Sequence, residues 1–179
     1  ILFVQFFAVV ATSITGGTAR DAYFLNLFDR SYLPLMFVAI AITMVIVINI
    51  YKRITDGKDI IQVITLGGVV FAVILLLIQI SLTRLFTMFS AGESIAALPE
   101  KWLIPFLFVF MEVIVSLSIL QFWMLAGEIF DARQAKRLFS ILGAGGSVAG
   151  MLAGYSLKPF VKTFGSDKLL YLTIFFILL

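Results

Sequence analysis

Three ionisable residues lie inside apolar segments of the sequence. Arg20 and Asp21 belong to the first such segment, and Glu112 follows Trp102 by ten residues in the fourth. At 1.5 Å per residue, Glu112 lies about 15 Å along a helix, near the middle of an apolar layer roughly 30 Å thick. An ionisable group at this depth is costly and usually faces a cavity or a charged partner. Glu112 is therefore predicted to line a substrate pathway; a hydrogen-bonded structural glutamate is the alternative.

The same measure of depth applies to Arg20. If the first segment ends near Phe28, Arg20 lies about 12 Å inside that end, on the same side of the membrane as Glu112. An ion pair between Arg20 and Glu112 would lower the cost of both charges. Alternatively, Gly16 and Gly17 unwind the helix, and Arg20 and Asp21 cap it at the interface. The residues predicted for the pathway are Arg20, Asp21, Glu112, Ser116 on the face of Glu112, and Gln121 further along that helix.

The composition defines the surroundings of these residues. Of 179 residues, 62% are hydrophobic and 13% are charged, whereas a soluble domain is nearer 45–50% apolar and about 25% charged. The absence of cysteine and histidine excludes disulfides, thiol chemistry and the usual zinc ligands. With no nucleophile–base pair and no cofactor-attachment motif, neither an enzyme, a metal site nor a cofactor is predicted. The net charge of +3 comes from residues at segment ends, which indicates membrane topology and not nucleic-acid binding.

Apolar runs of about 20 residues recur, as membrane-spanning helices require. Because backbone polar groups in lipid must be satisfied within a helix, we predict an all-α, polytopic bundle of six transmembrane helices with almost no strand. The expected helices cover about residues 1–27, 31–50, 60–82, 102–130, 138–157 and 169–179. Both ends of the chain fall inside apolar runs, so we expect a fragment of a longer protein, with the last helix truncated.

Two links between these segments are densely basic. Their position near helix ends favours the cytoplasmic side. The simpler interpretation is ordinary interfacial charge; alternatively, acids ending the fourth segment pair with bases opening the fifth and hold a cytoplasmic gate closed. The residues assigned to this gate or to topology are Lys52, Arg53, Glu128, Asp131, Arg133, Lys136 and Arg137.

A glycine-rich stretch, Gly143 to Ser147, is not interpreted as a dinucleotide loop, because that motif needs a preceding buried strand in a soluble unit. Gly146, Gly150 and Gly154 recur every four residues and form a stripe that allows helix backbones to approach closely. The residues predicted for helix packing are Gly143, Gly146, Gly150 and Gly154.

Several pieces resemble the ATP/ADP translocase (nucleotide transporter) family, and more narrowly its bacterial relatives. They are Ala19–Leu25, Tyr32–Pro34, and Phe122–Phe139 together with Gly143–Ser147. That family belongs to the major facilitator superfamily, so the resemblance implies the amino-terminal six-helix half of a transporter in the bacterial inner membrane. It further implies a second six-helix half, in the same gene or a partner chain, and alternating access around a site lined by helices one and four. The transported substrate would be ATP and ADP in exchange, or another organic anion.

Two other functions remain open on the sequence alone. Arg20 is the single basic residue that the first segment offers to a cavity. A membrane module of a signalling or assembly protein that moves nothing, or a structural subunit of a larger membrane complex, would also keep these features. The expected partners are the lipid bilayer, the second six-helix half and a nucleotide or other anion, with no nucleic acid.

Overall fold

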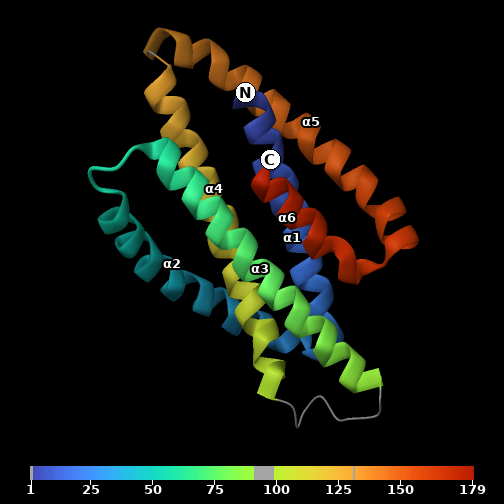
Figure 1. The fold of residues 1–179 in the computed structure, drawn as a ribbon. Helices are drawn as coiled ribbons and strands as arrows, with labels where there is room; N and C mark the ends of the chain where they lie inside the picture. The colour runs from blue at the N-terminus through green and yellow to red at the C-terminus, as the bar shows by residue number, and fades with distance from the viewer. Residues whose placement is uncertain (1, 91–98, 131) are drawn as a thin grey trace.

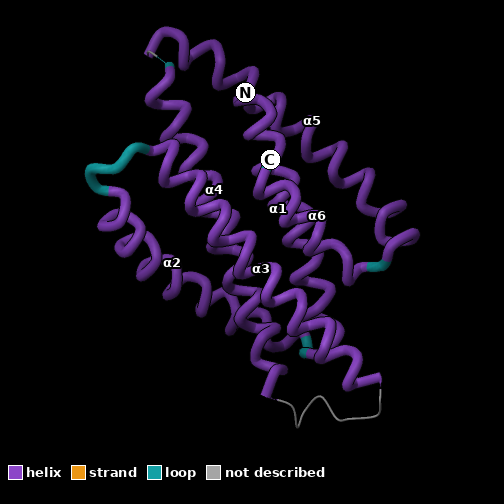
Figure 2. Tube along the Cα trace, in the orientation of Figure 1, coloured by secondary structure: helices purple, strands orange, loops and turns teal. Residues whose placement is uncertain are grey.

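The computed structural model describes residues 2–90, 99–130 and 132–179. In this part of the chain, short loops join helices and there is no strand (Figure 2). This confirms the predicted all-α fold. The long helices are α1 (Leu2–Leu27), α2 (Leu33–Thr55), α3 (Ile60–Ser90), α4 (Leu103–Ile129), α5 (Ala132–Phe164) and α6 (Leu169–Leu178). Short 3-10 helices η1 (Arg30–Tyr32), η3 (Pro99–Trp102) and η4 (Ser166–Lys168) precede α2, α4 and α6.

Four helices form a row in which each packs on the next, in the order α5, α1, α4, α2. On one side of this row, which faces the viewer in Figure 1 and is called its back below, α6 packs on α1, α3 packs on α4, and α3 and α6 contact each other. Figure 1 shows α2 and α5 at opposite edges, with α1 and α4 between them. The two helices predicted to carry the charged residues are therefore central neighbours.

The apolar core lies between the row and the two helices behind it. Phe24 of α1, Leu75 of α3, Phe108 of α4 and Leu170 of α6 are almost fully buried there. Between α1 and α6, the Thr15 hydroxyl donates to the Ala11 carbonyl at 2.8 Å and accepts from Thr173 at 3.0 Å. In lipid, close packing and such interhelical hydrogen bonds hold helices together, because water exclusion contributes little.

Four of the described helices are long and apolar enough to span a membrane. They are α1, η1 with α2 (Arg30–Thr55), α3 as far as Thr87, and α4. The described part of α5 is not among them, and α6 is a short apolar helix. The fifth and sixth spans therefore stay a prediction.

Several helices continue beyond the predicted apolar runs. Lys52 and Arg53 lie in the last turn of α2, and α5 continues through Pro159 to Phe164. Gly165 ends α5, because its φ of +89° suits glycine and few other residues. Helix ends follow backbone hydrogen bonds, which continue where hydropathy has already fallen. Two predicted links, Asp131–Arg137 and Lys158–Lys168, are thus largely helix; Asp131 itself lies outside the described residues.

Part of the predicted glycine stripe packs α5 against α1. A Cβ on Gly146 would collide with the Phe6 ring, and one on Gly150 would lie 3.8 Å from Ile14 Cδ1. Gly143 and Gly154 lie elsewhere, since a Cβ on either would meet nothing within 4 Å among the described atoms. A four-residue repeat turns about 40° per step on a helix, so Gly154 has rotated away from the contact with α1. Gly145, which the predicted stripe left out, also packs on α1, since a Cβ there would collide with the Phe3 ring. Ala149 and Ala153 are buried on the same helix.

Substituting Gly146 tests this packing. The Phe6 ring cannot easily turn aside, because it stacks on Phe122 at 4.4 Å between ring centroids and lies 5.9 Å from Trp123. We expect Gly146→Ala to destabilise the protein by about 1–3 kcal/mol through overpacking. Gly154→Ala is the matched control and should be neutral or stabilising by up to about 1 kcal/mol. Thermal unfolding in detergent, followed by circular dichroism, measures both; equal midpoints would contradict the packing described.

Candidate functional site

Arg20 is the centre of a charge cluster on α1 and α4. Its Nη1 donates to Oε2 of Glu112, and its Nε donates to Oδ1 of Asp21 at 3.2 Å. The guanidinium carbon lies 4.5 Å from the centroid of the Phe108 ring, a favourable cation–π arrangement. The structure therefore brings Arg20 and Glu112 together across two helices. Because α1 is a continuous helix through Gly16 and Arg20, Arg20 does not cap an unwound segment.

The three charged side chains differ in exposure. The Arg20 side chain is 16% exposed, that of Glu112 35% and that of Asp21 54%. Arg20 lies about 11 Å from the end of α1, and Glu112 about 14 Å from the start of α4, so both are well inside their apolar helices. The base is thus the most enclosed member of the cluster, and the two acids are more exposed.

Both acids belong to one side of the helical row. Glu112 and Ser116 are one turn apart on α4 and are both half-buried. Gly17 and Asp21 are one turn apart on α1, and a Cβ on Gly17 would meet nothing within 4 Å. The opposite side of α1 contacts α6 through Thr15. We call the side formed by Gly17, Asp21, Glu112 and Ser116 the open face, because α3 and α6 cover the other side.

Gln121 lies apart from this cluster. It follows Glu112 by nine residues, about two and a half turns, and so projects from the opposite side of α4. Its side chain is nearly buried, with Nε2 lying 3.4 Å from where a Cβ on Gly67 of α3 would be. The structure therefore separates Gln121 from Arg20, Glu112 and Ser116, with which its position in the sequence had grouped it.

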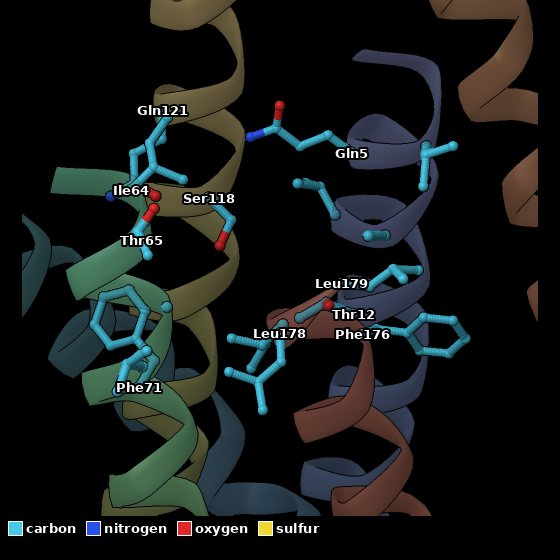
Figure 3. A pocket seen from close by; sticks show the side chains of 16 residues that line it. Gln5, Thr12, Ile64, Thr65, Phe71, Ser118, Gln121, Phe176, Leu178 and Leu179 are labelled. Carbon is cyan, nitrogen blue, oxygen red and sulfur yellow. The ribbon is translucent and has the colours of Figure 1, made fainter. Parts of the chain in front are cut away.

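Gln121 instead lines a cavity of about 550 Å³ behind the row, between α1, α3, α4 and α6. Figure 3 shows Gln5 reaching from α1, and Ser118 from α4, toward this space. Thr12 and Thr65 add hydroxyl groups to its lining. Its polar side chains are uncharged amides and hydroxyls, so the cavity differs in chemistry from the open face.

Arg20 is the only basic residue within Leu2–Leu27 and Leu103–Ile129, the two central helices. It faces two acids, so the cluster has a formal charge of −1 when all three groups are ionised. The carboxylates accept hydrogen bonds from two of its three nitrogens, Nη1 and Nε, so an incoming anion shares the guanidinium with them.

Three of the residues assigned to a cytoplasmic gate have described side chains, and these lie far along the helices from this cluster. Lys52, Arg53 and Glu128 are exposed near the ends of α2 and α4. Among the described side chains, none forms an ion pair with Glu128. Asp131 and the side chains of Arg133, Lys136 and Arg137 lie outside the described residues, so the gate stays a prediction.

The sequence did not single out Phe108, although a signal for it was present. Phe108 precedes Glu112 by one helical turn, and residues four apart on a helix are neighbours. It is 1% exposed and contacts the Phe24 ring, with 4.9 Å between centroids. The buried ring therefore supports the guanidinium from the side of the core.

These features define an all-helical integral membrane protein with a charge cluster between its two central helices. A family model described as TLC ATP/ADP transporter matches residues 68–169, more than half of the chain. The chain belongs to this family, which supports a general role in nucleotide transport. The matched region includes Glu112 but not Arg20. No curated protein and no solved structure gives a significant match.

A double-mutant cycle tests the contact between Arg20 and Glu112. We expect the single changes Arg20→Ala and Glu112→Ala and the double change to show a coupling energy of about 1 kcal/mol, toward the low end of the 0.5–3 kcal/mol found for contacting residues. The low value reflects solvent screening, because Glu112 is about one-third exposed. Unfolding midpoints in detergent provide the four stabilities. Strictly additive effects would mean that the pair does not form.

Proposed function

We propose that this chain forms half of a membrane carrier that moves nucleotides, or another phosphate-bearing organic anion, with Arg20 as the phosphate-binding residue. The observation that supports it most is the enclosed Arg20 guanidinium on the open face, held between acids from two helices. Membership of the TLC ATP/ADP transporter family supports a nucleotide as the anion.

Arginine suits this role for chemical reasons. Its planar guanidinium presents five N–H donors in a fork that matches phosphate oxygens, and it keeps its charge at any physiological pH. Hydrogen bonds between charged groups of this kind contribute about 1.5–3 kcal/mol each. Gly17 leaves open space one turn before Asp21, so a ligand can approach the guanidinium from the open face.

We further propose that transport proceeds by alternating access between two six-helix halves, as in the major facilitator superfamily. In transporters built from repeats, the substrate site forms at the interface of the two repeats, near the middle of the membrane. The open face brings a charged cluster to that depth, and a second half, encoded by the same gene or by a partner chain, would enclose it. Exchange of ATP for ADP then requires only that both bind the same Arg20. The bacterial inner membrane is the proposed location.

The ion pair also suits a membrane module that transports nothing, in which Arg20 and Glu112 simply join α1 to α4. Transport by the purified protein separates these functions. A full-length protein that carries no labelled nucleotide or other organic phosphate in liposomes would establish the non-transporting alternative.

Replacing Arg20 tests its proposed role in uptake. We expect Arg20→Ala to lower the uptake of radiolabelled ATP and ADP by full-length protein in liposomes at least tenfold, since one charged hydrogen bond is worth about 1.5–3 kcal/mol. Arg20→Lys should give an intermediate rate, because it keeps the charge and loses the fork. Arg30→Ala, which removes an exposed arginine from η1, is the control. Unchanged uptake by Arg20→Ala would reject the assignment.

A further inference from the structure

We infer that Glu112 is an internal counterion that occupies Arg20 when no substrate is bound, and that it thereby allows the empty carrier to change sides. The carrier would then take up nucleotide into vesicles that contain none, in addition to exchanging one nucleotide for another. This inference rests on the proposed transport function. It concerns whether the carrier only exchanges nucleotides or also takes them up when none is present on the other side.

The geometry distinguishes Glu112 from the other acid beside Arg20. Glu112 reaches Arg20 from the neighbouring helix and binds Nη1, a terminal nitrogen of the guanidinium fork. Asp21 is the next residue on the same helix, binds Nε at 3.2 Å, and is 54% exposed against 35% for Glu112. Water can therefore solvate Asp21 more readily, whereas the charges of Arg20 and Glu112 compensate each other within the protein.

A bound phosphate and Glu112 would compete for the same donors. A phosphate oxygen binds an arginine best through the paired terminal N–H groups, and Glu112 accepts from one of these nitrogens. Basic side chains on two neighbouring helices are exposed: Lys52 and Arg53 lie in the last turn of α2, and Arg84 lies on α3, which covers the opposite side of the row from the open face. An anion that binds Arg20 through this pair of terminal N–H groups therefore competes with Glu112 for Nη1.

The same pairing governs what the empty carrier can do. Alternating access passes through a state in which the site is closed to both sides, and an unpaired charge enclosed there is costly. A carrier whose arginine has no internal partner must hold an anion in order to reorient, which enforces strict exchange. With Glu112 on Arg20, the closed state forms without substrate, and the carrier can return empty.

Uptake into two kinds of vesicle tests this inference. Full-length protein is reconstituted into liposomes that are either empty or loaded with unlabelled ADP, and the entry of radiolabelled ATP is measured. The wild-type protein should take up ATP into empty vesicles as well as loaded ones. Entry only into loaded vesicles would overturn the inference, and this result needs no variant. Absence of entry into both would instead refute the proposed function.

The variants Glu112→Gln and Asp21→Asn then form a matched pair, since each replaces an acid beside Arg20 with its amide. Glu112→Gln should lower the ratio of net uptake to exchange about tenfold, as expected from loss of one charged hydrogen bond in the closed state. It should also lower the apparent KM for ATP, because the competing carboxylate is gone. Asp21→Asn should leave the ratio near the wild-type value. An unchanged ratio in Glu112→Gln, or an equal fall in both variants, would overturn the inference.

Discussion

A guanidinium enclosed within an apolar helix must have compensating charge, and this requirement explains how the centre of the molecule is arranged. Arg20 of α1 is compensated by Glu112 of α4, so these two helices must be neighbours even though ninety-two residues separate the pair. The buried Phe108 ring fixes the guanidinium on its core side, and Asp21 lies on its more exposed side. The remaining helices are then placed around α1 and α4, with α5 and α2 at the edges and α6 and α3 behind.

This arrangement separates two polar regions that belong to the same helices. The open face carries one base and two acids, whereas the cavity behind the row is lined by amides and hydroxyls from Gln5, Gln121 and their neighbours. The two regions are separate because Glu112 and Gln121 project from opposite sides of α4, half a turn apart around its axis. Only the open face offers a charge that an anion can bind. The small residues of α5 allow that helix to pack directly on α1, where the Phe3 and Phe6 rings lie against Gly145 and Gly146.

The sequence allowed the ion pair to be predicted because depth along a helix is simply proportional to residue number. Arg20 and Glu112 lie at similar depths, and that one coordinate was sufficient to suggest their contact. Direction around the helix was harder to obtain. Gln121 was grouped with Glu112 because it is polar and on the same helix, although rotation carries it to the other side. Gly154 was assigned to a packing stripe for a similar reason, since a four-residue repeat drifts around the helix.

Features that depend on three-dimensional contact or on backbone hydrogen bonding were not accessible from hydropathy. The extension of α2, α3 and α5 past their apolar runs is of this kind, because helices continue into polar sequence. The support of Arg20 by Phe108 is another: the position of Phe108 one turn before Glu112 was visible in the sequence, but its contact with Arg20 on the neighbouring helix was not. The family relationship, by contrast, was visible in the short motifs around Arg20 and Phe122, and the family match to residues 68–169 confirms it.

The proposed transport role requires the open face to be a water-filled substrate pathway, and cysteine labelling tests this requirement most directly. The chain contains no cysteine, so Gly17→Cys and Ser116→Cys can be introduced singly into full-length protein freed of any other cysteine, with Leu77→Cys as a lipid-exposed control on α3. A membrane-impermeant thiol reagent should label positions 17 and 116, ATP should protect both, and position 77 should stay unlabelled. No labelling at 17 and 116, or labelling that ATP does not reduce, would contradict the account.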